Sequence, residues 1–399
     1  MPAPDLVPAT APAAVTIDPD TLRVDGSAVV YRLYDVGYDI RLDRALDLLA
    51  GKGPARVRPV RGEAQALQIP NPPITVILGH ERVTLGDAAG NGAGAFLEQV
   101  EAEVSARIFD FGVVSLRLRI DLPAGTTWRR FTAFGNAVDA SAALAPLFDH
   151  HLRLLTERIA PAVERPMLAA QTEDYIVYRL ARLTDAGGAP VSPARLRDED
   201  VVPLLLNERR PLSAAARREL LPHRFSYYAD DLAILTWDNA LVVEPQVHDA
   251  DVQFILEFAN AQLLELRYYD AELDAQMPGV YDRITTLRRG RISGLLRNRY
   301  APVLAALQAT VADSTELVER AENALKVTDD VYLARVYSAA LEIFRARAWR
   351  AGIDRKLGII RETYAMLNDE AQTARGETLE MAIVALIVLE IVLALVRGH

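Results

Sequence analysis

The pattern of hydrophobic and polar positions divides the chain into two parts of different character. Residues 18–245 contain short apolar runs, separated by glycine, proline and aspartate, which is typical of strands and tight turns. From residue 246 onward no convincing strand pattern remains, and apolar residues recur at spacings of three and four, which is typical of helices. We therefore predict an α+β head followed by an all-α antiparallel helical stalk and a C-terminal hydrophobic helix.

Strands and helices in the predicted head do not alternate as regular βαβ units, which favours an α+β fold. We predict strands at 28–36, 74–79, 82–85, 107–122 and 174–183, and a meander at 224–245 with a tight turn at Asp238-Asn239. We predict helices at 41–50, 127–163 and 193–221, the second of them broken.

A weak internal repeat raises the question of two related halves. VVYRLYDV at 29–36, then a helix and FDFGVVSLRLRIDLP, resembles IVYRLARL at 176–183, then a helix and ADDLAILTWDNALVVEP. Common ancestry of the two halves and chance similarity between apolar strands both explain the pattern.

Two seams of apolar positions predict that residues 246–375 form helices packed as a coiled-coil hairpin or bundle. The seams are Leu304, Leu307, Val311, Ser314, Val318, Ala321 and Leu325, and then Ile353, Leu357, Ile360, Tyr364, Leu367, Ala371 and Ala374. A middle helix is predicted at Leu333, Tyr337, Ala340 and Phe344, with Thr328-Asp329-Asp330 suited to its N-terminus. An up-down-up stalk then places the residues near 300 and a turn near 351 at the same end.

Residues 376–399 contain the longest apolar run, in which Glu390 is the one polar residue between Met381 and Val396. We predict one membrane span at 379–396, somewhat shorter than the ~20 residues typical of a spanning helix. A buried core helix or a subunit contact is the alternative. The residues assigned to this membrane or oligomer helix are Leu379, Glu380, Ile383, Leu386, Glu390 and Leu393.

Glu390 does not continue the last apolar seam, which projects onto Met381, Ala385 and Val388. A glutamate in mid-span facing lipid costs roughly 2.5–3.5 kcal/mol. Either the helix re-orients near Gly376, or Glu390 meets a second subunit.

The amino-acid composition excludes several classes of protein function. The 399 residues carry a net charge of −10, which argues against a protein that coats nucleic acid. The absence of cysteine excludes disulfides, thiolate metal sites and cysteine nucleophiles. Residues 1–17, rich in alanine and proline, are predicted to be a disordered leader without the features of a signal or transit peptide.

No motif assigns a catalytic, cofactor-binding or metal-binding residue, and we expect no enzyme activity. The glycine-rich stretch at 90–95 matches GxGxxG/A on paper but lacks the surrounding βαβ unit. The acidic cluster of Asp230, Asp231 and Asp238 leaves a metal- or nucleotide-dependent hydrolase as an alternative. Turn residues explain the same cluster.

One arginine cluster contains Arg288, Arg289 and Arg291, and a second contains Arg347 and Arg350. We predict that the two clusters meet at the membrane-distal pole of the stalk, where these five arginines could contact an anionic partner. Such a pole would suit RNA phosphates, which makes an RNA- or ribosome-binding adaptor an alternative function. Pairing with the protein's own carboxylates is the other interpretation.

Several stretches resemble the RMD family ("required for meiotic nuclear division"), over roughly residues 28–396. They are FDFGVV at 109–114, ADDLAILTWDNALVVE at 229–244, NAQLLELRYYDAELD at 260–274, KVTDDVYLARVYSAA at 326–340 and LEMAIVALIVLEIVLAL at 379–395. The resemblance implies a C-terminally anchored membrane protein that forms homo-oligomers and has no established catalytic residues. Its studied mitochondrial members support translation.

Together these observations lead us to expect a non-enzymatic, tail-anchored, homo-oligomeric scaffold without a cofactor. Its partners would be further copies of itself and the lipid bilayer, and a ribosome or RNA under the alternative. We expect a bacterial inner-membrane location, with the bulk of the chain in the cytoplasm.

Overall fold

The computed structural model describes residues 18–50, 71–86, 98–208, 210–245, 251–289 and 330–397, and isolated positions between 305 and 312. Side chains at 279–289, and some from 370 onward, lie outside the described set. The chain forms two compact units. We call residues 1–264 with 328–344 the sheet unit, and residues 265–327 with 345–399 the helical unit. The predicted leader at 1–17 lies outside the described residues.

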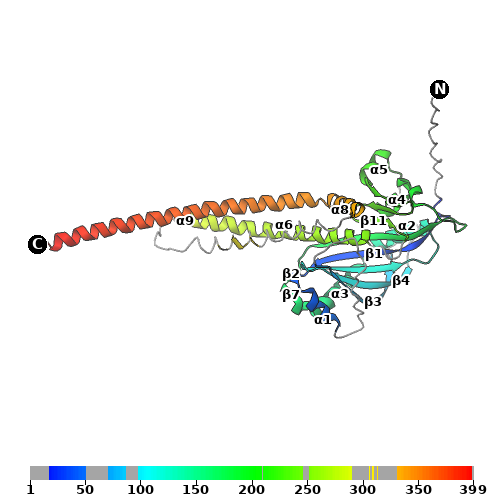
Figure 1. Ribbon diagram of the computed structural model, residues 1–399, viewed down its shortest axis with the longest axis horizontal. Coiled ribbons are helices and arrows are strands. Elements are labelled where there is room, and N and C mark those ends of the chain that lie inside the picture. The colour runs from blue at the N-terminus through cyan, green and yellow to red at the C-terminus, as the bar shows by residue number, and fades with distance from the viewer. Residues whose placement is uncertain are drawn as a thin grey trace, which may run out of the picture. The chain divides into compact units, whose positions relative to one another are not determined.

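The sheet unit is built on one mixed sheet with the strand order β3-β4-β5-β1-β8-β11-β10-β9 (Figure 1). The strands are β1 (Arg23–Asp35), β3 (Ile74–Leu85), β4 (Glu98–Ile108), β5 (Val113–Asp121), β8 (Thr172–Thr184), β9 (His223–Phe225), β10 (Leu232–Leu235) and β11 (Asn239–Val243). β6 (Thr126–Thr127) pairs with β1, and β2 (Gly37–Ile40) pairs with β7 (Val163–Pro166) in a small second sheet. The predicted α+β character of the head is confirmed.

The two halves of the sequence repeat share a strand order but not a strand direction. The repeated strands β1 and β8 lie side by side and antiparallel, with Val29 opposite Val177. In the large sheet, each is followed by three strands whose last member returns beside the first, β5 beside β1 and β11 beside β8. β5 is antiparallel to β1, whereas β11 is parallel to β8.

Three of the predicted strands needed correction. The predicted strands at 74–79 and 82–85 are one strand, β3, with an irregularity at Gly79. The predicted strand at 107–122 is instead the end of β4, a turn and β5. Gly112 makes that turn possible, because its φ is +94° and an added Cβ would lie 1.8 Å from the Gly37 carbonyl oxygen.

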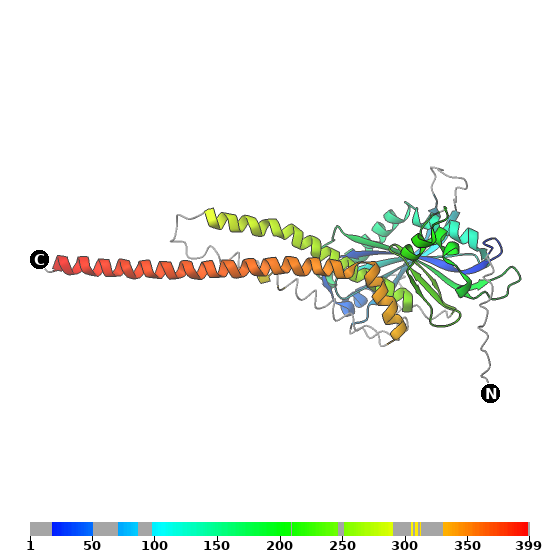
Figure 2. The same cartoon turned by 90° about the horizontal axis from the view of Figure 1, so that it is seen from above.

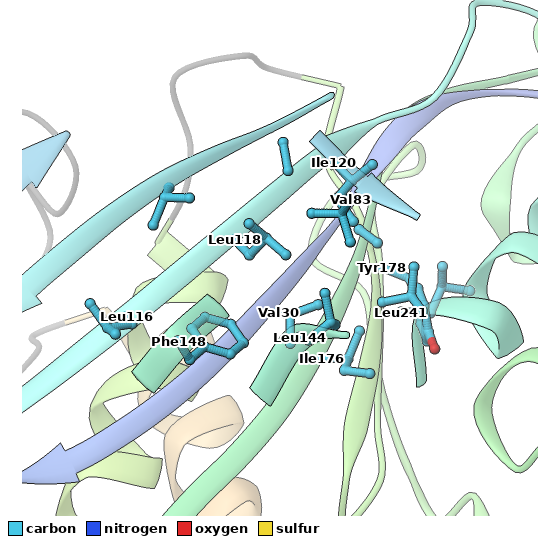
Figure 3. Close-up of a cluster of buried hydrophobic side chains, with 14 of the residues drawn as sticks. Val30, Val83, Leu116, Leu118, Ile120, Leu144, Phe148, Ile176, Tyr178 and Leu241 are labelled. Carbon is cyan, nitrogen blue, oxygen red and sulfur yellow. The ribbon is translucent and has the colours of Figure 1, made fainter. Parts of the chain in front are cut away.

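One face of the sheet packs on helices from the first two thirds of the chain. These are α1 (Leu42–Ala50), α2 (Trp128–Asp139), α3 (Leu144–Ile159) and α4 (Asp198–Leu205). Figure 3 shows this core, in which Val30, Leu118 and Ile176 from three neighbouring strands lie near Phe148 of α3. The Tyr178 hydroxyl donates a hydrogen bond to the Gly135 carbonyl oxygen of α2 (3.2 Å).

The predicted helix at 41–50 corresponds to α1, and the predicted break within 127–163 lies between α2 and α3. The predicted helix at 193–221 is divided into η2 (Pro193–Arg195), α4 and α5 (Ala214–Leu220).

The opposite face of the sheet packs on the start of α6 (Asp251–Arg289) and on α8 (Val331–Ile343). The Tyr175 ring of β8 lies 5.6 Å from the ring of Phe344, which follows α8. Phe258 of α6 contacts Phe109 and Tyr337 at ring distances of 6.0 and 6.2 Å. The predicted middle stalk helix is α8, capped as expected by Asp330, and it belongs to the sheet unit.

The helical unit contains the second part of α6 and the 52-residue helix α9 (Ala346–Arg397). Ile353, Leu357, Ile360 and Leu367 are buried along one side of α9, and Tyr364 is half-buried, which confirms most of the described part of the second seam. The first seam lies largely outside the described residues. The turn predicted near 351 is instead at Arg345, whose φ is +52°.

α6 and α9 run in the same direction, as Figures 1 and 2 show. The Arg267 guanidinium lies over the Trp349 ring at 6.0 Å. Further along both helices, Lys356 Nζ lies 2.7 Å from carboxylate oxygens of Asp270 and Asp274. Residue numbers therefore increase together along the two helices. At 1.5 Å per residue, this register places the end of α6 about level with Gln372 of α9.

α9 is continuous through Gly376. Of the two alternatives for Glu390, a re-orientation of the helix near Gly376 is therefore excluded, because no break separates the apolar seam from the apolar run that follows it.

Candidate functional site

The C-terminal part of α9 exposes apolar side chains on all sides. Its exposed residues are Met381, Ile383, Val384, Leu386, Ile387, Val388, Leu389, Ile391, Val392, Leu393 and Leu395, each between 47 and 70% accessible. Consecutive positions on an α-helix are 100° apart, so this set surrounds the helix axis. The earlier part of α9 buries a single side, as an amphipathic helix does. We call residues 381–395 the apolar segment.

Two glutamates belong to this region. Glu380 precedes the apolar segment and Glu390 lies within it, and both are exposed. Positions one turn from Glu390, at Leu386, Ile387 and Leu393, are apolar. The Glu390 carboxylate therefore lies on a surface that otherwise offers hydrocarbon.

Five of the six predicted residues of the membrane or oligomer helix, Glu380, Ile383, Leu386, Glu390 and Leu393, are exposed on α9. The side chain of Leu379 lies outside the described residues. Within the part of the chain that the structure describes, no helix is both long and apolar enough to cross a membrane.

The prediction that the two arginine clusters lie at one pole is wrong. Arg347 and Arg350 lie in the first turns of α9, whereas Arg288 and Arg289 end α6. Because α6 and α9 are parallel, the end of α6 is roughly 35 Å further along α9 than Arg347 and Arg350, at 1.5 Å per residue. Arg291 lies outside the described residues. The two clusters do not share one end of the helical unit.

Lys356 joins α9 to α6 through two carboxylates. Burial opposes its charged form, but the hydrogen bonds to Asp270 and Asp274 outweigh burial and raise the pKa of Lys356. Both carboxylates belong to the stretch NAQLLELRYYDAELD at 260–274. In the structure they hold two helices in register.

A buried charge pair, which the sequence analysis missed, joins α6 to the sheet. Arg107 of β4 forms a salt bridge with Glu257 of α6, and the two side chains are 4 and 0% exposed. The Arg107 guanidinium also covers the Phe254 ring at 4.6 Å. The sequence did contain a sign of this pair. Arg107 lies within the apolar strand segment VSARIF, and Glu257 lies within the apolar stretch FILEFANA.

This pair has a further basic neighbour. Arg117 Nη1 of β5 lies 4.0 Å from Glu257 Oε2, while Glu257 Oε1 has no hydrogen-bond partner among the described residues. The Arg107 Nε atom donates to Thr75 Oγ1 (3.3 Å). Because a buried charge is costly unless it is paired, the cluster fixes the position of α6 on strands β3 to β5.

The acidic cluster proposed for a hydrolase is built into turns. The Asp231 carboxylate accepts a hydrogen bond from the Tyr227 backbone N–H (2.8 Å). Asp238 lies between β10 and β11, and burial raises the pKa of its carboxyl group. Among the described residues, no group of three or more histidines and carboxylates is arranged to hold a metal ion.

Comparison with known proteins identifies relatives of the sheet unit. Residues 25–250 match the family described as the N-terminal domain of uncharacterized protein MJ0711. The chain is 26% identical over 227 residues to "Uncharacterized protein MJ0711" of Methanocaldococcus jannaschii. That match covers 56% of this chain and 66% of the relative, slightly less than two thirds of the relative's length. No solved structure matches the chain.

Proposed function

The chain belongs to the MJ0711 N-terminal domain family, and we propose that it is a non-enzymatic, homo-oligomeric scaffold anchored in a membrane by its C-terminal helix. The observation that carries this proposal is the apolar segment of α9, whose side chains are exposed on every side. Contiguous exposed apolar surface of this kind marks sites of protein or membrane contact.

The length of this segment approaches the thickness of a bilayer's hydrocarbon core. Residues 379–396 contain 18 positions, which as a helix span roughly 27 Å against the ~30 Å of a hydrocarbon core. The helix continues unbroken from Ala346, so an anchor at its C-terminal end would be rigidly joined to the part that packs on α6.

Glu390 supports the homo-oligomeric part of the proposal. A carboxylate facing lipid in mid-bilayer costs roughly 2.5–3.5 kcal/mol. The corresponding helix of a second copy would remove Glu390 from lipid and provide hydrogen-bonding groups. The sequence resemblance to the RMD family also supports an anchored oligomer, and we propose a bacterial inner-membrane location with the sheet unit in the cytoplasm.

The alternatives receive less support from the structure. An RNA- or ribosome-binding adaptor relied on one arginine pole, and the two clusters lie far apart along α9 and α6. A hydrolase relied on Asp230, Asp231 and Asp238, of which Asp231 supports the β9–β10 loop through its hydrogen bond to Tyr227.

Membrane fractionation of three forms of the chain tests the proposal. The full chain should sediment with membranes and resist extraction by alkaline carbonate, whereas a chain lacking 377–399 should be released. I383K/L386K/L393K keeps the chain length and should also be released. L154K/M167K changes two exposed apolar residues of the sheet unit and should fractionate like the unaltered chain. If the chain lacking 377–399 still sediments with membranes, the proposal of a membrane anchor is wrong.

A further inference from the structure

Three tyrosines gather on the surface of the sheet unit. Tyr227 and Tyr228 lie in the loop between β9 and β10 and are each 63% exposed. Their rings are 4.8 Å apart and nearly perpendicular, at 89°. The Tyr227 ring also lies 5.5 Å from that of Tyr332, in the first turn of α8. We call Tyr227, Tyr228 and Tyr332 the tyrosine patch.

The loop that carries the two exposed rings is held by hydrogen bonds. Besides the bond from the Tyr227 N–H to Asp231, the Ser226 hydroxyl donates to the Tyr228 carbonyl oxygen (2.7 Å). The Ser192 hydroxyl donates to the Ala229 carbonyl oxygen (3.0 Å). Rings presented on a fixed backbone lose little conformational entropy when they bind a partner.

The surroundings of the patch are predominantly acidic. Burial and then the nearby carboxylates of Asp231, Glu244 and Asp330 raise the pKa of Tyr332. Asp230 is exposed in the same loop. Arg335 is a basic neighbour of Tyr332, and its guanidinium lies 5.8 Å from the Phe225 ring centroid. A cation on an aromatic face is therefore already present beside the patch.

We propose that the tyrosine patch is a docking surface for a basic segment of a partner protein. An arginine or lysine of that segment would lie on the faces of Tyr227 and Tyr228, which attract cations through their π electrons. Neighbouring basic residues would face Asp230 and the carboxylates around Tyr332. This charge also disfavours a nucleic-acid partner, because phosphates would be repelled. The inference is independent of the membrane anchor.

Binding of a fluorescent peptide of alternating arginine and glycine to the full chain in detergent tests the inference. Y227A/Y228A should weaken binding by about tenfold, the size expected for two cation–π contacts. Y227F/Y228F keeps both rings and should bind like the unaltered chain. W237A removes an exposed aromatic ring in the β10–β11 loop and should also leave binding unchanged. None of these changes alters the net charge, so general attraction to an acidic chain is constant across them.

A D230N variant should weaken binding less than Y227A/Y228A, and the loss should disappear at high salt. A peptide with glutamine in place of arginine should not bind. Equal binding by the unaltered chain and by Y227A/Y228A would overturn the inference. So would ring-dependent binding of choline without binding of the peptide. A smaller assembly of Y227A/Y228A in light scattering would also overturn it, because the patch would then join copies of this chain.

Discussion

The ammonium nitrogen of Lys356 lies 2.7 Å from Asp270 Oδ1, which connects helices α9 and α6 through two residues that are 86 positions apart in the chain. The contact sets α9 parallel to α6, so that the end of α6 is about level with Gln372, before the apolar segment of α9. The arginines at 288 and 289 are thereby placed far from those at 347 and 350.

Replacing Lys356 with methionine should loosen this helix pair. Asp270 would lose its cation while both carboxylates remain, and we expect a loss of about 1 kcal/mol in the free energy of unfolding, because the pair is partly exposed. Urea unfolding measures the loss. D369N removes an exposed carboxylate from the same helix and should leave the free energy of unfolding unchanged.

Replacing Glu257 with leucine should be far more damaging. The Arg107 guanidinium would be buried without its partner, which costs about 3–5 kcal/mol. R107M/E257L removes both members of the pair and should be more stable than E257L alone. A double-mutant cycle by urea unfolding measures the difference, and strictly additive effects would contradict a paired cluster.

Asp35 should make the sheet unit more stable in mildly acidic solution. Burial raises the pKa of its carboxyl group to about 7, although the hydrogen bond from the Gly37 N–H opposes the shift. The unfolded chain has an ordinary value of about 3.9, so between these values the folded state holds the extra proton. This group's contribution to stability therefore falls as pH rises from about 4 to 7.

D35N should remove that dependence and stabilise the protein most above pH 7. Unfolding free energies at pH 5 and pH 8 measure the effect, with D47N, an exposed carboxylate of α1, as the control. An identical pH profile for D35N and the unaltered chain would show that Asp35 does not titrate in this range.

Gly112 should tolerate no side chain. G112A would place a Cβ against the Gly37 carbonyl oxygen, whereas G125A has an equally left-handed φ of +71° but open space around it. Both carry the strain of positive φ, about 1 kcal/mol, and thermal unfolding should show an additional loss in G112A alone. Equal losses would mean that the turn can relax away from Gly37.

Much of the sheet was predictable because its strands follow local patterns. β1, β8 and the meander of β9 to β11 were recognised from apolar runs bounded by turn residues. The β4–β5 turn was missed because Phe109 and Phe111 make FDFG read as part of one apolar strand. Nothing local showed that Gly112 must pack against Gly37.

The helix arrangement was less predictable because it depends on contacts between distant residues. Periodicity identified the buried side of α9, including Ile353 and Ile360. Periodicity could not show that Lys356 would pair with Asp270. The direction of α6 relative to α9 therefore could not be predicted. The Arg107–Glu257 pair was missed for the same reason, since each residue alone looks like an isolated charge in an apolar run.

The location of Val388 relative to lipid tests the central claim most directly. The chain has no cysteine, so V388C can carry a single environment-sensitive fluorophore in the middle of the apolar segment, and M366C can carry it earlier in α9. In reconstituted vesicles, lipids with a quencher on the acyl chain should quench the label at 388 and leave that at 366 bright. Aqueous iodide should do the opposite. Quenching of the label at 388 by iodide, but not by the lipid quencher, would contradict a membrane anchor.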